Sequence, residues 1–344
     1  MSDQSAIPAT SPPLGRPTPT ATRSEMTGIL LLLAAGLFWS LNGALIKLIN
    51  DGGRGPGGVT IALYRSLFAG LFLVPMARGR FHTLRVGPTF QSVKAGPTFK
   101  SVKARPTFKS VVQQLCPVRT AAVACVFFFT LMTVCFVVAN TKTTAANAII
   151  LQYTSTFWIF GLSPWLLREN PRPREFGLLA LAMLGIAVIF VGNAATSLPG
   201  LIIALASGLF FGLLTLMIRQ LRDTDSAAVT VLNNLGSAAL LLPVGLLVGG
   251  LTLSPREWLL LIVMGVVQFG LPYYLYALGL ARVAAYKAAL LTMIEPVLVP
   301  VWTYLAVGET VPATTLIGAA LILVALIAFL RGTPSAVRAA PPPA

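Results

Sequence analysis

Ten segments of roughly 20 mostly apolar residues follow one another along this chain, a length that matches the hydrocarbon core of a bilayer. No other feature constrains the fold as strongly, because helices that are apolar on all sides have no face to turn toward water. The segments are Thr27–Ile49, Val59–Ala77, Ala121–Ala139, Ala145–Leu167, Phe176–Val191, Leu201–Ile218, Ala227–Val248, Trp258–Leu278, Ala284–Val307 and Pro312–Phe329. We therefore predict an all-α integral membrane protein with ten transmembrane helices.

The composition agrees with a membrane protein and argues against other classes. Hydrophobic residues make up 56% of the chain and charged residues 10%, whereas soluble domains carry about 25% charged residues. The net charge of +15 lies almost wholly between the apolar segments, where the positive-inside rule accounts for it, so we predict no nucleic-acid partner. The three cysteines form no CxxC pair and there is one histidine, His82. We therefore predict no metal site and no other cofactor.

The basic residues also predict how the chain is oriented. The loop between the second and third segments alone holds nine of them, from Arg78 to Arg119, and the fourth loop holds Arg168, Arg172 and Arg174. The loops on the opposite side hold only Arg54, Lys142 and Arg256. This asymmetry predicts that both termini are cytoplasmic in a multi-pass protein of a bacterial inner membrane.

The two halves of the chain resemble each other. Glu169 follows Thr156 by thirteen residues, Glu309 follows Pro296 by thirteen, and each glutamate ends one apolar segment shortly before the next. The stretch Gly36–Lys47 likewise matches Gly208–Arg219. With five helices in each half, the second copy is inverted in the membrane, as in many secondary transporters. We assign one repeat to residues 27–192 and one to 200–331, and we expect disordered tails at 1–26 and 332–344.

This pattern resembles the EamA-type permeases of the drug/metabolite transporter superfamily over residues 27–330. Their typical proline thirteen residues before the glutamate is present in the second half as Pro296 but replaced by Thr156 in the first. We therefore expect a bend at Pro296 and have no such reason to expect one at Thr156. The resemblance implies a basket of ten helices around a central cavity. Many family members export amino acids or other metabolites.

An unusual loop at residues 86–111 carries three copies of a nine-residue unit that contains proline, phenylalanine and lysine. A basic loop of this kind could lie on an anionic membrane surface, or it could be a tandem duplication in a tolerant loop, which we favour. We predict that deletion of Gly87–Ala104 leaves transport by the inserted protein unchanged in a flux assay. Loss of flux in a correctly inserted deletion variant would contradict this interpretation.

Charged residues inside membrane segments are rare and are functional candidates. Glu295 could carry a coupling proton or bind a substrate amine, while Arg65 and Lys287 could bind a substrate carboxylate. Pro296 removes a helical hydrogen bond beside Glu295 and can bend the helix. Structural roles such as snorkelling remain alternatives for Arg65 and Lys287. Further polar or aromatic candidates for a pathway lining are Trp39, Asn42, Tyr64, Asn147, Gln152, Tyr153, Gln268 and Tyr273.

The sequence thus favours a secondary transporter of small organic solutes that works by alternating access, exports amino acids or related metabolites and could be coupled to protons. It contains no GxxxxGK[ST] nucleotide loop, and we predict no enzymatic activity. The alternatives are an importer of phosphorylated or nucleotide-type metabolites, or an intramembrane enzyme or lipid-handling protein. The expected partners are the solute and membrane lipids, with the chain as a monomer or homodimer.

Overall fold

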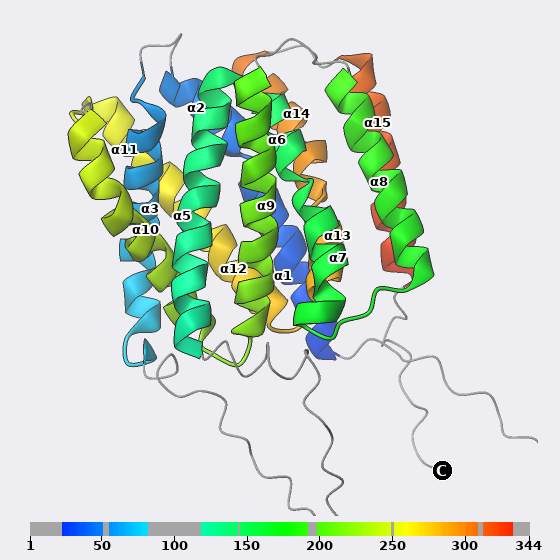
Figure 1. Ribbon diagram of the computed structural model, residues 1–344. Coiled ribbons are helices and arrows are strands. Elements are labelled where there is room, and N and C mark those ends of the chain that lie inside the picture. Colours follow the sequence, from blue (N-terminus) through cyan, green and yellow to red (C-terminus); the bar gives the residue numbers. More distant parts are fainter. Residues whose placement is uncertain are drawn as a thin grey trace, which may run out of the picture.

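A computed structural model describes residues 23–50, 55–81, 118–143, 145–191, 198–248, 251–308 and 312–332. Our interpretations of both far termini, of the repeats at 86–111, and of His82, Cys116 and Glu309 concern residues outside these ranges. Within the described ranges the structure consists of helices joined by short turns, with no strand (Figure 1).

Each half of the chain supplies five helical passes. In the first half these are α1 (Arg23–Trp39) with α2 (Asn42–Asn50), α3 (Gly58–Ala77), α5 (Val118–Lys142), α6 (Ala145–Gln152) with α7 (Ser155–Leu166), and α8 (Pro173–Val191). In the second half they are α9 (Leu198–Gln220), α10 (Ser226–Val248), α11 (Pro255–Val263) with the π-helix η3 (Met264–Gly270) and α12 (Leu271–Leu280), α13 (Ala285–Leu291) with α14 (Ile294–Val307), and α15 (Ala313–Gly332). All ten predicted segments are therefore helical, with boundaries that differ from the prediction by a few residues.

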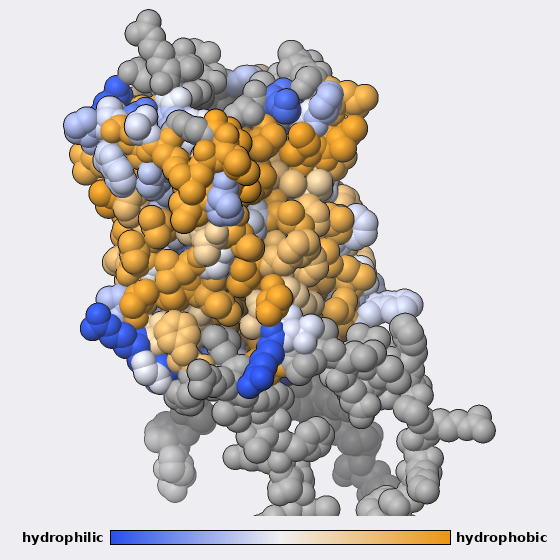
Figure 2. Space-filling view, turned by 60° about the vertical axis from the view of Figure 1, so that its left-hand side comes forward, coloured by the Kyte–Doolittle hydropathy of each residue, from blue (hydrophilic) through white to orange (hydrophobic). Residues whose placement is uncertain are grey.

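Nine helical stretches among the described residues are long and apolar enough to cross a membrane. The fourth predicted pass, which consists of α6 and α7, is not among these nine. Figure 2 shows that apolar side chains cover the middle of the visible face and hydrophilic ones lie toward its ends. Large apolar residues such as Leu247 and Trp165 are 88% and 68% exposed, which suits contact with lipid rather than water.

Equivalent helices of the two halves pack against each other. The helix α3 lies on its counterpart α10, and α8 lies on its counterpart α15. At the second of these contacts Gly185 and Gly318 face each other, and a Cβ at either position would overlap the carbonyl oxygen of the other glycine. Small residues at such crossings let two backbones approach closely in a membrane. Figure 1 shows that α1 and α9 begin at opposite ends of the bundle, as the inverted repeat requires. We call the end where α1 begins and α15 ends the terminal end.

The fourth and ninth passes are both broken, at equivalent positions. The break between α13 and α14 precedes Pro296, as expected, and the break between α6 and α7 occurs although Thr156 stands in place of the proline. In the fourth pass the Thr154 hydroxyl donates to the Leu151 carbonyl at 2.6 Å, which competes with the helical hydrogen bond of that carbonyl. The backbone N–H groups of Thr154 and Thr156 instead bond carbonyls three residues earlier. Local side-chain hydrogen bonding therefore replaces the proline.

Candidate functional site

A cavity lies inside the bundle between the two halves. Side chains from both halves form its wall, and the broken fourth and ninth passes supply three of them. The lining residues are Trp39, Asn42, Arg65, Met132, Phe136, Gln152, Tyr153, Phe211, Gln268, Phe269, Tyr273 and Glu295. The lining combines aromatic, amide and charged groups, which is the usual composition of a ligand site.

Arg65 is the cation of this lining. It projects from α3, is 2% exposed, and its guanidinium carbon lies 4.2 Å from the centroid of the Phe269 ring. Its Nε has no hydrogen-bond partner among the described residues. A cation–π contact compensates only part of the desolvation of a guanidinium. The residual N–H donor and the charge make Arg65 a strong binding group for an anion that enters the cavity.

A π-helix brings the neighbouring cavity residues into place. The segment η3 lies inside the eighth pass, between α11 and α12. Its residues Gln268 and Phe269 line the cavity. Close packing against α3 is possible because Gly265 has no side chain: a Cβ there would lie 2.8 Å from the Arg65 carbonyl oxygen. Single π-helical turns inside α-helices frequently occur at functional sites. Here the π-helix places Phe269 against the Arg65 guanidinium.

Glu295 is the acidic group of the lining and belongs to the first turn of α14. Its Oε2 lies 2.8 Å from the Tyr153 hydroxyl oxygen, which is also 2.8 Å from the Thr292 carbonyl oxygen. Tyr153 lies at the break between α6 and α7, and Thr292 at the break between α13 and α14. The two broken passes therefore meet through these three groups at the cavity wall.

Aromatic rings and amide groups complete the lining. The Trp39 ring lies 4.9 Å from the Tyr273 ring and 5.9 Å from the Phe211 ring, both edge-on. The Oδ1 of Asn42 and the Oε1 of Gln268 are buried and have no hydrogen-bond partner among the described residues. Buried amide oxygens normally find a donor, so these two acceptors are available to a solute that carries N–H or O–H groups.

The structure brings eight of the eleven predicted pathway residues together, and three lie elsewhere. Lys287 lies outside the cavity, where its Nζ is 2.7 Å from the Glu25 Oε1 at the start of α1. The Tyr64 hydroxyl donates to the Leu251 carbonyl at 3.0 Å, and the Asn147 side chain lies 3.5 Å from the Thr143 hydroxyl. None of the three belongs to the lining of the cavity.

Four lining residues were not among the sequence candidates: Met132, Phe136, Phe211 and Phe269. One of them had a signal in the sequence, because the match of Gly36–Lys47 with Gly208–Arg219 places Phe211 opposite Trp39. Phe269 is adjacent to the candidate Gln268. Met132 and Phe136 resemble every other apolar residue of α5 in the sequence, so only the packing of that helix distinguishes them.

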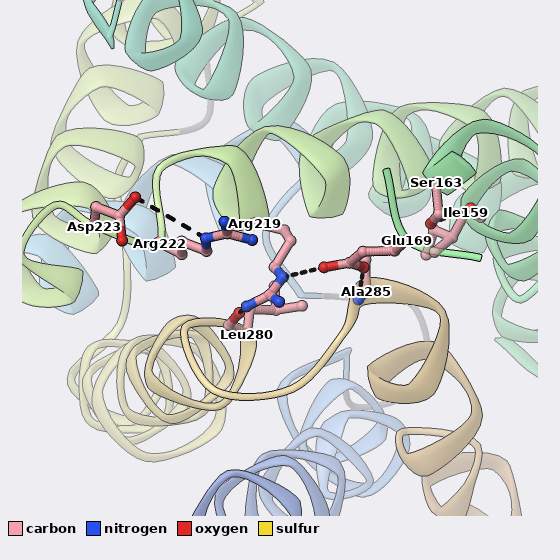
Figure 3. A network of polar contacts seen from close by, with 8 residues as sticks. All are labelled: Ile159, Ser163, Glu169, Arg219, Arg222, Asp223, Leu280 and Ala285. Atoms are coloured by element: carbon pink, nitrogen blue, oxygen red, sulfur yellow. Dashed lines mark hydrogen bonds and ion pairs between the residues drawn. The ribbon is translucent and has the colours of Figure 1, made fainter. Parts of the chain in front are cut away.

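A polar network joins the two halves at the terminal end, and Figure 3 shows it from close by. The Nε of Arg219, at the end of α9, lies 2.6 Å from the Glu169 Oε1 in the α7–α8 connection. The Glu169 Oε2 accepts the Ala285 backbone N–H at 2.7 Å, and the Arg219 Nη1 donates to the Leu280 carbonyl at 2.5 Å. Glu169 is thus an ion-pair partner of Arg219. The Lys287–Glu25 pair is a second link between the halves.

We expect Arg219→Ala to loosen the terminal end. The side chains of Arg219 and Glu169 are 11% and 10% exposed, and removal of one partner from a largely buried pair leaves the other without compensation. A cysteine introduced at position 215, one turn inside this network, should then react with a maleimide at least about tenfold faster. A tenfold change requires that the equilibrium between the closed and the open terminal end shifts by only about 1.4 kcal/mol. The measurement is the labelling rate of Thr215→Cys in a chain whose three native cysteines are replaced.

Arg222→Ala is the matched control for this measurement. Arg222 lies at the same end, its side chain is 45% exposed, and its one ion pair among the described residues is a long 4.0 Å contact with Asp223. Equal labelling rates in the Arg219 and Arg222 variants would contradict the idea that the network holds the two halves together.

Comparison with known proteins identifies relatives of this chain. The model of the EamA-like transporter family matches residues 26–191 and again residues 198–331. A protein of Archaeoglobus fulgidus described as an uncharacterized transporter is 30% identical over 216 residues, which are 62% of this chain and 77% of that protein. A solved crystal structure aligns with a TM-score of 0.68 at 19% identity and covers 87% of this chain and 96% of its own. At this identity the last comparison shows a shared fold.

Proposed function

The chain belongs to the EamA-like transporter family, and we propose that it exports amino acids or related small metabolites across the membrane by alternating access. Its place in this family makes it a multi-pass membrane transporter. The solute, the direction of transport and the coupling are what we propose beyond that.

The observation that carries the proposal is the presence of two opposite charges in one cavity. Arg65 comes from the first half and Glu295 from the second. Among the described residues, neither has an ion-pair partner within 4.0 Å. A zwitterion satisfies both groups at once, with its carboxylate on the Arg65 guanidinium and its ammonium on the Glu295 carboxylate. Arginine is well suited to the first role because its fork binds a carboxylate through two N–H groups.

The remaining lining residues support a solute with an apolar part. The ammonium of such a solute has further acceptors in the amide oxygens of Asn42 and Gln268. Its apolar part has a wall of aromatic rings, including Trp39 and Phe211, whose burial of the solute surface supplies non-directional binding free energy. This combination favours amino acids over fully polar metabolites.

We propose that Glu295 also binds the coupling proton. A carboxyl group inside a membrane segment is a typical proton carrier in transporters. A substrate ammonium and a proton would then compete for the same carboxylate, so binding of one displaces the other. This competition is a direct physical basis for the exchange of substrate against protons.

The arrangement of basic residues supports the proposed location in a bacterial inner membrane with the terminal end in the cytoplasm. Among the described residues, Arg174, Arg219 and Arg331 lie on helices that begin or end there, and Arg282 lies in the connection between α12 and α13. An excess of arginine and lysine on one side of a membrane protein is typical of the cytoplasmic side.

An importer of phosphorylated metabolites is the main alternative, and the lining argues against it. A phosphate dianion in a low-dielectric site needs more than one cation for compensation. Arg65 is the one cation of the lining formed by the described residues, and Lys287 pairs with Glu25 instead. No observation favours an intramembrane enzyme or lipid-handling protein over a transporter.

The proposal is tested by flux through proteoliposomes that contain the purified protein. We expect counterflow of at least one group of apolar amino acids, which is reduced in the Arg65 and Glu295 variants discussed below. Counterflow of phosphorylated solutes without counterflow of amino acids would replace the proposed substrate class.

A further inference from the structure

The Tyr153 hydroxyl faces two acceptors with a single hydrogen. Its oxygen lies 2.8 Å from the Thr292 carbonyl oxygen and 2.8 Å from the Glu295 Oε2. A phenol donates one hydrogen bond, a carbonyl donates none, and an ionised carboxylate donates none. Both contacts are full two-centre hydrogen bonds at the same time only if Glu295 carries a proton, which it then donates to the Tyr153 oxygen.

The Thr292 carbonyl is available to Tyr153 because of the proline that follows it. Pro296 stands four residues after Thr292 and has no N–H, so it cannot make the helical hydrogen bond to this carbonyl. The Glu295 N–H bonds the carbonyl from three residues away at 3.0 Å, and the second lone pair accepts the Tyr153 hydroxyl. Pro296 thus creates the acceptor that Tyr153 uses.

We propose that Tyr153 is a positioning residue that transmits the protonation state of Glu295 to the breaks in the fourth and ninth passes. With Glu295 protonated, its O–H donates to Tyr153, and Tyr153 donates to the Thr292 carbonyl. With Glu295 ionised, Tyr153 turns its hydrogen to the carboxylate, and the bond to the Thr292 carbonyl is lost. The proton enters and leaves at Glu295, and no other bond is made or broken. This inference rests on the proposed function, since it takes Glu295 as the site of the coupling proton.

The bond matters for movement because it joins the two halves at their breaks. Tyr153 belongs to the first half and Thr292 to the second, and each lies between two short helices. The packing of α13 against α7 keeps these breaks together. Deprotonation therefore moves the Tyr153 hydrogen bond from the Thr292 backbone to the Glu295 side chain. The backbone at the α13–α14 break is then no longer held by Tyr153, which is the kind of differential contact that shifts an equilibrium between two states.

The proton-sensitive link has no counterpart at the equivalent positions of the inverted repeat. In the match between the halves, Met293 corresponds to Tyr153 and Ser155 corresponds to Glu295. A methionine has no hydroxyl, and a serine side chain does not lose its proton as a carboxyl group does. The inverted repeat thus supplies two equivalent breaks, while the proton-sensitive link belongs to one pair of residues.

The other groups around Glu295 leave this assignment intact. Arg65 of α3 and Tyr273 of α12 are the remaining charged or titratable side chains of the lining formed by the described residues. The helices α1, α2 and α15 pack against α14, and their contribution to that lining is limited to the uncharged Trp39 and Asn42.

Infrared spectroscopy of the purified protein with Tyr153→Phe tests the proposal. The carbonyl stretch of protonated Glu295 is assigned by its disappearance in Glu295→Gln. In Tyr153→Phe we expect this band to shift to higher wavenumber, because the carboxyl hydroxyl has lost its acceptor. The band should still respond to pH, whereas transport by this variant should no longer depend on pH. Tyr64→Phe, which removes a hydroxyl outside the cavity, should change neither.

An unshifted band in Tyr153→Phe, or no assignable band in the wild type at any pH, would overturn the proposal. Absence of amino-acid transport in the wild type would instead contradict the proposed function, because the spectra need no substrate. If Tyr153→Phe does not fold, the phenol C–O stretch decides the question. We expect a pH-dependent change of that stretch in the wild type that is lost in Glu295→Gln, and the same change in both proteins would exclude the link.

Discussion

Glu295→Gln is expected to insert and fold like the wild type and to lose all pH dependence of transport in proteoliposomes. Glutamine has the shape of a protonated glutamate but can neither release nor bind a proton at this position. Its amide N–H can still donate to the Tyr153 oxygen, so the contacts at the two helix breaks remain possible. The change therefore removes the proton-binding group and the negative charge and little else.

Substrate binding should weaken together with the pH response. The ammonium of an amino acid loses its carboxylate partner in the cavity, and removal of one member of a buried charge pair costs about 2–5 kcal/mol. We expect a loss of apparent affinity of at least about 30-fold, which corresponds to the lower limit of that range. The measurement is counterflow of radiolabelled amino acids at several pH values.

Glu257→Gln is the matched control. Glu257 forms a capping box with Ser254 at the exposed start of α11 and lies outside the cavity. Its variant should transport with the pH profile of the wild type. An unchanged pH profile and affinity in Glu295→Gln would remove Glu295 from the mechanism.

Arg65→Ala is expected to have the second large effect, on solutes that carry a carboxylate. The guanidinium is the cation of the lining, and it lies against Phe269 with an Nε that has no partner among the described residues. A bound carboxylate in the wild type would accept a charge-assisted hydrogen bond from this Nε. Without it, affinity for amino acids should fall by at least about 30-fold, again the lower limit for a buried charge pair.

Two comparisons make this prediction specific. Amines that resemble the substrate but lack its carboxylate should bind the variant and the wild type equally well. Arg65→Lys should recover part of the affinity, because lysine keeps the charge but not the planar fork of donors. If Arg65→Ala is correctly inserted and binds carboxylates as the wild type does, then Arg65 serves only the packing of α3 against η3.

The membrane passes could be predicted because the bilayer imposes their length. An apolar stretch such as Val59–Ala77 leaves few alternatives to a spanning helix, and α3 is Gly58–Ala77 in the structure. The two charged cavity residues could be predicted for a related reason, since Arg65 and Glu295 would be very unfavourable if they faced lipid. The family resemblance likewise followed from the whole pattern of ten segments in two halves, with Glu169 and Glu309 at matched positions.

The break in the fourth pass could not be predicted from the presence of a proline, which is what predicted the break in the ninth pass. Pro296 is visible in the sequence as a helix breaker, whereas Thr156 is not. The Thr154 hydroxyl donates to the Leu151 carbonyl. Gly208 lets α9 lie close to that carbonyl, since a Cβ on this glycine would stand 2.8 Å from the Leu151 carbonyl oxygen. The first effect is one of several local bonds open to a threonine hydroxyl, and the second depends on packing against another part of the chain.

The sequence by itself determined the class of the protein, its passes, the inversion of its halves and the two charges inside the membrane. These follow from local free energies, namely the transfer of apolar residues into lipid and the high free energy of a charge there. The tertiary structure decided which polar side chains share a cavity. Tyr153 and Tyr64 are alike in sequence, yet one bonds Glu295 and the other the Leu251 carbonyl. Lys287 pairs with Glu25, 262 residues away in the chain. Such partners depend on helix rotation and on contacts between distant segments, which no local pattern encodes.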